Sequence, residues 1–383
     1  MYQSGMKRWR VLGTIITPLH IGNGETLDPF SCIYEAGELI EFDYVNALQH
    51  ADEPTRARIE NYLSSRIETE SQADQVRKLL WELPWRNHIL RKFNVSYQIK
   101  VALANDQLKA LRNREIYLFA NNPRTRERII PGSSLKGAMR TGWVNKRSLG
   151  RKSHGKFEPD ALGYLEQKIV KDKMQDVVRM EGDPFGEWKI ADAKISGISE
   201  LAAISIYRRK MVRKGEMMFE REQRQQPVPP NPHFFETVAG EGQTYDFETK
   251  MTFFPRKSVK DHISLDQWIK AINEHSRESF KSSYNGVQLQ DASKEFRENI
   301  EELENTWFNA DNTVRESRKS CILSLGRFTG FLSKTASEHR KHEIKSRGPK
   351  QFKYGKDANP ITRILSEDSL PLGFVKLEFD EIK

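Results

Sequence analysis

The chain of 383 residues has only two cysteines, Cys32 and Cys321, and no long apolar run. Two cysteines cannot form a cysteine-rich zinc site, and nothing points to secretion, although a disulfide between them stays open. No segment approaches the roughly 20 apolar residues that span a bilayer. The N-terminus lacks the apolar core and cleavage pattern of a signal peptide. We therefore expect a soluble cytoplasmic protein that does not bind a membrane.

The charge is moderately basic and unevenly distributed. Sixty-two Lys and Arg residues stand against 53 Asp and Glu residues, which gives a net charge of +9 and a pI near 9.3. Two basic stretches stand out, one from Tyr207 to Gly215, which includes Arg208 and Arg209, and one from Ser337 to Lys356. A basic surface on one part of a mixed protein favours a polyanionic partner such as RNA. Solvated loops with the same composition are the alternative.

The order of the expected elements favours the α+β class. Strands are expected at 9–17, 95–101, 115–120, 198–211, 245–253, 322–325 and 374–379, a hairpin at 30–42, and polar helices at about 43–92. Strands, helices and strands again in both halves favour antiparallel sheets over a doubly wound parallel fold. Two ferredoxin-like domains fit this order. We place them at 1–235, with a helical insertion at about 43–92, and at 236–383, with the boundary near Asn231–Gly240.

The segment from Ile130 to Thr141 is the most informative motif. An apolar strand end runs into Pro131-Gly132, and Ser133 or Ser134 is expected to cap the helix that follows. Helix N-termini bind anions, and Lys136 and Arg140 share one helix face because they lie four residues apart. The motif therefore predicts a phosphate site, with an ordinary capped strand–turn–helix as the alternative. A nucleotide-binding enzyme is disfavoured because the spacing of a Walker loop is absent.

Several further motifs occur in an order that is typical of one family. They are Thr17-Pro-Leu-His-Ile-Gly-Asn-Gly24, the segment 130–141, Pro184-Phe-Gly followed by Ile190-Ala-Asp192, Leu325-Gly-Arg-Phe-Thr-Gly-Phe331 with Lys334-Thr335, and Pro371-Leu-Gly-Phe-Val-Lys-Leu377. Together they resemble the RAMP subunits of type III CRISPR effector complexes. The resemblance runs from about residue 9 to 379. It is greatest to the fifth subunit of the type III-A (Csm) complex.

The resemblance implies two RRM-like, ferredoxin-like domains and a non-catalytic subunit that binds CRISPR RNA (crRNA). Such a subunit caps the 3′ end of the guide and takes part in its 3′ maturation during antiviral defence. Its partners would be crRNA, the repeating RAMP backbone subunit, the small subunit and host nucleases that trim the guide, with target RNA met indirectly. No cofactor is implied. The residues expected to bind RNA are His20, Asn23, Ser133, Ser134, Lys136, Arg140, Arg208, Arg209, Arg327, Thr329 and Lys334.

His20 carries the main alternative, a RAMP endoribonuclease that processes CRISPR RNA with this histidine as general base. Its ordinary pKa of about 6.5 would suit proton transfer, but no partner at a recognisable spacing supports catalysis. Asp28 lies where backbone subunits carry a cleaving aspartate, but their surrounding motif is absent. Glu25 and Asp28 alone are too few for a metal site. We expect no catalytic residue and no metal.

Overall fold

The computed structural model describes most residues of the chain. These are 5–64, 69–111, 115–148, 184–213, 216–221, 233–241, 245–257, 259, 262–284, 293–308, 319–329, 343–344, 353–354 and 362–382. Lys334 lies outside them, as do the side chains of Arg208 and Arg209. Within the described residues, no helix is long and apolar enough to cross a membrane.

The first sheet is antiparallel and has the connectivity of a ferredoxin-like unit. Its order is β15 (Lys319–Ser324), β19 (Phe374–Ile382), β1 (Lys7–Ile15), β14 (Phe247–Phe253), β9 (Ala193–Ile195) and β7 (Ile129–Ile130), with β8 (Trp188–Ile190) also paired to β14. Helix α6 (Gly132–Ser148) lies between β1 and β9 in the chain, and α8 (Leu265–Tyr284) lies between β14 and β19. The strands β19, β1, β14 and β9 thus form the 4-1-3-2 order of a βαββαβ unit.

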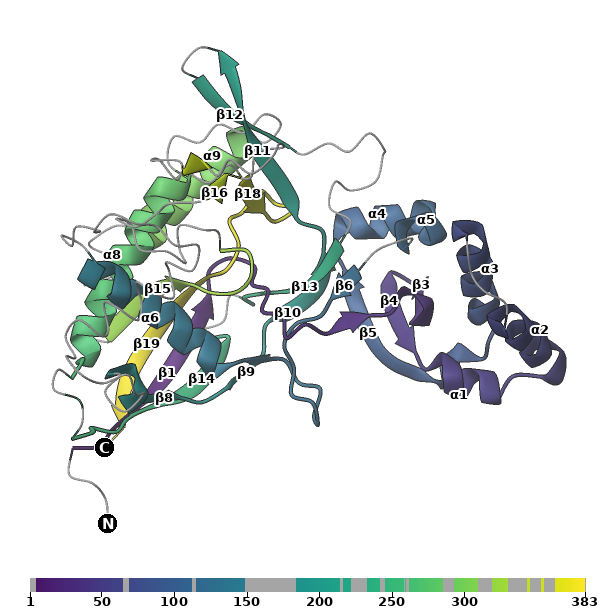
Figure 1. Ribbon diagram of the computed structural model, residues 1–383, viewed down its shortest axis with the longest axis horizontal. Coiled ribbons are helices and arrows are strands. Elements are labelled where there is room, and N and C mark those ends of the chain that lie inside the picture. The colour runs from purple at the N-terminus through teal and green to yellow at the C-terminus, as the bar shows by residue number, and fades with distance from the viewer. Residues whose placement is uncertain are drawn as a thin grey trace.

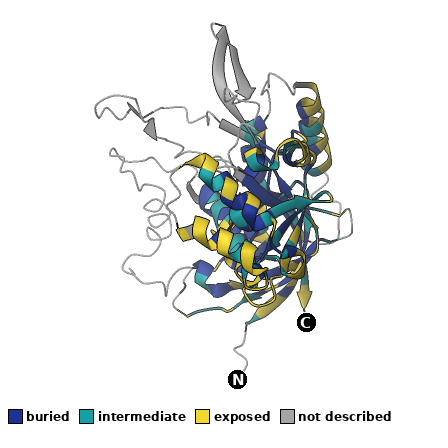
Figure 2. Ribbon diagram, turned by 90° about the vertical axis from the view of Figure 1, so that its right-hand side faces the viewer, coloured by how far each residue is buried: buried dark blue, intermediate teal, exposed yellow. Residues whose placement is uncertain are grey.

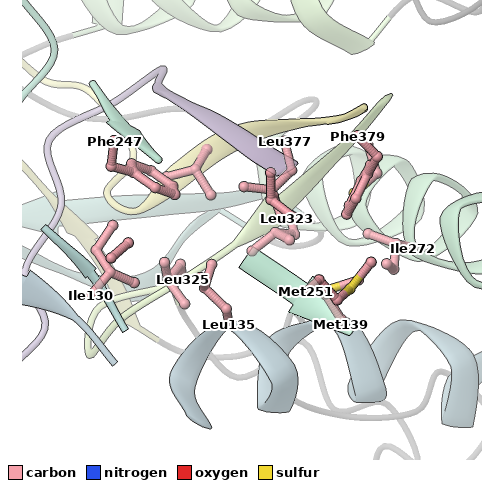
Figure 3. Packing of buried hydrophobic residues seen from close by; sticks show 14 of the residues in the cluster. Ile130, Leu135, Met139, Phe247, Met251, Ile272, Leu323, Leu325, Leu377 and Phe379 are labelled. Carbon is pink, nitrogen blue, oxygen red and sulfur yellow. The ribbon is translucent and has the colours of Figure 1, made fainter. Parts of the chain in front are cut away.

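The packing of α6 and α8 against this sheet forms the largest core cluster. Leu135 and Met139 of α6 and Ile272 of α8 point at the strands, where they meet Met251, Leu323 and Leu377 (Figure 3). Strand β14 alternates buried and exposed residues, as its sequence predicts, because one face of a strand is covered while the other is solvated. The indole N–H of Trp268 donates to the carbonyl of Met139 at 2.8 Å. This contact ties the two helices together.

The second sheet lies beside the first and carries most of the early helices (Figure 1). Its order is β2 (Thr26–Leu27), β6 (Glu115–Tyr117), β13 (His233–Ala239), β10 (Ile198–Ala202), β5 (Ile89–Val95), β4 (Glu38–Phe42) and β3 (Cys32–Glu35). The expected hairpin is confirmed, with Ala36 and Gly37 at positive φ in its turn. The helical region expected at about 43–92 contains α1 (Tyr44–Gln49), α2 (Glu53–Ser64), α3 (Glu70–Trp81) and the short η2 (Trp85–Asn87) before β5 begins.

The strand expected at 95–101 is wrong. Strand β5 ends at Val95, and residues 97–105 form the helix α4 (Tyr97–Asn105), followed by α5 (Gln107–Leu111). Ile99 and Leu103 are both buried, and their spacing of four places them on one helix face against the second sheet. The apolar run therefore carries a helical period that its β-branched residues obscured.

The remaining elements complete an α+β protein, as expected. They are η1 (Pro29–Ser31), η4 (Pro184–Glu187), α9 (Ser293–Leu303), η5 (Glu304–Phe308), the sheet of β12 (Glu216–Arg221), β11 (Ser205–Arg213) and β18 (Thr362–Leu365), and the pair β16 (Glu343–Ile344) and β17 (Lys353–Tyr354). Exposed residues gather on the outer faces of the helices (Figure 2).

The predicted division at 235/236 does not follow the sheets. Strand β1 pairs with β14 and β19 from the other side of that division. Residues around the expected linker form β13, in which Phe234, Phe235 and Val238 are buried. The first and last strands, β1 and β19, thus pair with each other inside one sheet. The division into two separately folding domains stays a prediction.

Candidate nucleic-acid interface

A groove of about 500 Å³ opens where three of the sequence motifs meet. The loop after β1 contributes Ile21, Gly22 and Gly24, helix α6 contributes Ser134, Gly137, Ala138 and Thr141, the end of β15 and its loop contribute Ser324, Leu325, Gly326, Arg327 and Thr329, and β6 contributes Tyr117. These segments are far apart in the chain. The fold brings them together because β1 and β15 both lie next to β19.

His20 connects two of these segments, the loop after β1 and the glycine-rich loop after β15. The residue is 1% exposed, and its backbone carbonyl accepts from the Arg327 backbone N–H at 3.0 Å. Its Nδ1 lies 2.8 Å from the carbonyl oxygen of Glu236. Because a carbonyl only accepts, Nδ1 carries the proton of the neutral ring. Burial, together with the nearby Arg327 guanidinium, lowers the pKa of His20 to about 4.

The position of His20 does not suit a general base. The ring packs against Phe119, Phe235 and Phe328, at centroid distances of 6.3, 5.3 and 5.6 Å. It does not line the groove. Nε2 is buried and lacks a hydrogen-bond partner among the described residues. His20 therefore joins the first loop to the glycine-rich loop, and the geometry offers the endoribonuclease alternative no support.

Helix α6 presents small residues to the groove. Ser134, Gly137, Ala138 and Thr141 follow the spacing of one helix face and line the wall. Lys136 and Arg140 lie on another face and are not among the lining residues. The Arg140 guanidinium lies over the Phe185 ring, 5.2 Å from its centroid. The two cations expected to hold a phosphate are thus not brought to this groove.

The N-terminus of α6 is capped by Asp192 and not by Ser133 or Ser134. The helix begins at Gly132, whose N–H donates to Asp192 Oδ1 at 2.8 Å. Ser133 is exposed and Ser134 is half-buried, both within the first turn. The expected serine cap is therefore wrong, because the helix begins before both serines and a carboxylate from the chain after β8 accepts from its first N–H.

The glycine-rich loop is held tightly against His20. Gly326 has φ +96°, and a Cβ there would lie 2.3 Å from the His20 carbonyl oxygen. Only glycine fits this approach. The close contact turns the exposed Arg327 and the buried Thr329 to the groove. Among the described residues that line the groove, Arg327 alone is charged. Asn23 is exposed between the lining Gly22 and Gly24, and its side chain accepts from the Glu25 N–H.

Sequence reasoning missed two residues of the site, Tyr117 and Glu236. Tyr117 lines the groove, and its ring stacks on Phe235 at 5.2 Å. The buried Glu236 carboxylate accepts from the Phe119 N–H at 2.8 Å and from the Arg128 guanidinium. Glu236 thereby fixes the chain beside Tyr117. A glutamate within an apolar stretch was the available signal, since a buried carboxylate requires partners.

The two acidic candidates have structural partners. Asp28 caps η1 by accepting from the Phe30 N–H at 3.0 Å. Burial raises the pKa of Glu25, but the hydrogen bond from Asn121 and the guanidinium groups of Arg91 and Arg126 outweigh it and lower that pKa. Within the described residues, no cluster of three or more His, Cys, Asp or Glu side chains is arranged to hold a metal ion.

Comparison with known proteins places the chain in a family. The model of the RAMP superfamily matches residues 14–333, which contain all the segments that line the groove. The chain belongs to the RAMP superfamily. This confirms the family that the motifs indicated. No curated protein sequence matches this RAMP chain significantly.

A chain of a solved structure shares the fold. A chain in the cryo-EM structure of a Csm–crRNA–target RNA ternary complex of a type III-A CRISPR-Cas system aligns over 97% of this RAMP chain and 100% of its own length. The TM-score is 0.56 at 15% identity. The crystal structure of T. onnurineus Csm5 aligns over 96% of this chain and 99% of its own, with 15% identity and a TM-score of 0.47.

Proposed function

We propose that this RAMP protein is a non-catalytic subunit of a type III-A Csm complex and that its groove holds the backbone of crRNA. One observation carries the proposal. The motifs at 17–24, 130–141 and 325–331, which are far apart in the chain, contribute residues to a single groove. The family match and the similarity of fold to a chain in a Csm–crRNA–target RNA complex support it.

The lining of the groove suits a sugar–phosphate backbone. The Ser134, Thr141 and Thr329 hydroxyls line the groove, and those of Thr141 and Thr329 donate to the Gly137 and Gly326 carbonyls. The exposed loop glycines Gly22 and Gly24 let a strand approach the backbone closely. Phosphate oxygens accept from such hydroxyl and N–H groups, and from arginine, without reading sequence. Arg327 supplies the positive charge within the groove. RNA binding is therefore expected to be sensitive to salt and largely independent of sequence.

The finer role at the guide's 3′ end rests on the family resemblance. The protein would cap the end of the filament of backbone subunits and take part in 3′ maturation, next to the small subunit and trimming nucleases. Deletion of the protein would then shift the 3′ ends of small RNAs that co-purify with the complex. Unchanged 3′ ends would contradict the capping role but not the proposal that the groove binds RNA.

Gly137 offers a direct test of the groove. It is exposed on α6, and a Cβ at this position would meet no atom within 4 Å. Gly137→Glu should therefore fold normally while placing volume and negative charge in the groove. We expect it to lower affinity for single-stranded RNA at least about tenfold in a titration with the full chain, while the matched variant Gly137→Ala keeps its affinity. Equal RNA affinity of Gly137→Glu and the wild type would contradict the proposal.

A further inference from the structure

Tyr117 and Arg327 form a flat platform at the edge of the groove. The Arg327 guanidinium lies over the Tyr117 ring, 4.6 Å from its centroid, and both residues line the groove. Behind them, the Tyr117 and Phe235 rings stack with an interplanar angle of 8°. A guanidinium that lies over an aromatic ring is held by the ring and presents its own outer face as a flat surface.

The platform is held rigidly before any ligand binds. Phe235 is 3% exposed and packs edge-on against Phe328 at 4.6 Å. His20 packs against both of these rings. The Tyr117 hydroxyl donates to the exposed Glu115 carboxylate, which fixes the outer end of the ring. A side chain held on several sides loses little conformational freedom when a ligand stacks on it.

We propose that a nucleobase of single-stranded RNA stacks on the Tyr117–Arg327 platform. This inference rests on the proposed function, because it names the part of the RNA that the groove recognises beyond the backbone. Glu115 stands beside the Tyr117 hydroxyl, and a carboxylate repels phosphate at this end of the groove. Every base has a π-face, so stacking adds affinity with little dependence on sequence. A platform of this kind orients the strand by one base, while Ser134 and the two glycine-rich loops border its phosphates.

The test compares an RNA oligonucleotide with an abasic ribose–phosphate oligonucleotide of the same length. Both are titrated into the full-length wild type, Tyr117→Leu and Tyr117→Phe. We expect Tyr117→Leu to weaken binding of the base-containing RNA about 5- to 150-fold, which corresponds to the range for base–aromatic stacking. Binding of the abasic strand should not change. Tyr117→Phe keeps the ring and should bind like the wild type. Tyr97→Leu is the control, because Tyr97 lies 79% exposed on α4 and does not line the groove.

Salt dependence separates stacking from charge. Loss of a stacked base lowers affinity at every salt concentration but leaves the slope of log K against log salt unchanged, whereas loss of a phosphate contact reduces that slope by about one. Tyr117→Leu should therefore keep the wild-type slope. Arg327→Lys keeps the charge but loses the flat guanidinium, so it should weaken binding of the base-containing RNA alone.

The outcomes distinguish the two proposals. If the wild type binds neither oligonucleotide, the proposed function fails. If the wild type binds RNA and Tyr117→Leu binds it equally well, the platform is overturned while the groove stands. An equal loss for both oligonucleotides, or a thermal unfolding midpoint of Tyr117→Leu far below that of Tyr117→Phe, would assign Tyr117 a purely structural role and also overturn the platform.

Discussion

Gly326 and Gly137 both line the groove, but the surroundings of their Cα atoms differ sharply. At Gly326 a Cβ would lie 2.3 Å from the His20 carbonyl oxygen, and φ is +96°. At Gly137, in the middle of α6, a Cβ would meet no atom within 4 Å. The first glycine lets two loops approach each other, and the second leaves room beside a helix. Glycine is thus needed for folding at Gly326, whereas at Gly137 it keeps the surface of the helix open. Substitutions at the two positions should therefore differ in their effect on stability.

The largest effect is expected from Gly326→Ala. Its positive φ and its contact with a backbone oxygen should together cost about 2–5 kcal/mol of the free energy of unfolding, since the loop must move away from His20. Urea denaturation measures this loss. Gly24→Ala is the matched control, because Gly24 has φ +92° but open space around it. Gly24→Ala should cost only about 1–2 kcal/mol, the conformational part alone. Equal losses of unfolding free energy for the two variants would show that the loop can move away from His20 without further loss of stability.

His20 provides a second test of the close contact between the loop after β1 and the glycine-rich loop. Its pKa is lowered from 6.5 to about 4, so the folded state binds fewer protons than the unfolded state between these values. The contribution of His20 is fully present above pH 6.5 and is lost as the pH falls towards 4, by up to about 3 kcal/mol. Unfolding free energies measured across this window check the slope. His20→Asn, which keeps a donor for the Glu236 carbonyl, should flatten it. An unchanged slope would assign the pH dependence to other groups.

The outcomes for α6 show what the sequence can and cannot specify. The strands expected at 245–253 and 374–379 form as β14 and β19, and Leu135 and Met139 give α6 a buried face. The face that borders the groove depends on where β1 and β15 place their loops, which is a tertiary property. Lys136 and Arg140 do not line this groove, and their contact with RNA stays a prediction. Small residues at 134, 137, 138 and 141 were the unused signal.

The hydrogen-bond partners of buried polar groups could not be predicted from the sequence either. The Glu236 carboxylate accepts from the Phe119 N–H and the Arg128 guanidinium, which lie more than 100 positions away in the chain. No local sequence pattern predicts these contacts. The same applies to the pairing of β1 with β19, which joins the two ends of the chain. Periodicity predicts which elements form and which face each one buries. It does not predict which distant elements meet.

Asp192 tests the attachment of α6 at its N-terminal end. Its carboxylate accepts from the Gly132 N–H at 2.8 Å, so Asp192→Ala should lower the free energy of unfolding by about 1 kcal/mol, the usual effect of losing a helix cap. Asp192→Asn keeps an acceptor and should cost less. Thermal unfolding with circular dichroism measures both. No change in either variant would indicate that the helix end is held by other contacts.

The smallest effect, and the one of opposite sign, is expected at Gly137. Because glycine is a poor helix former and Gly137 has space for a Cβ, Gly137→Ala should raise the free energy of unfolding by about 0.5–1 kcal/mol. Its affinity for single-stranded RNA should stay within about twofold of the wild type, since a methyl group leaves most of the groove open. A gain in stability with a large loss of RNA affinity would mean that the RNA backbone touches the α6 backbone at this residue. Gly137 would then resemble Gly326, with the close partner supplied by the ligand instead of by His20.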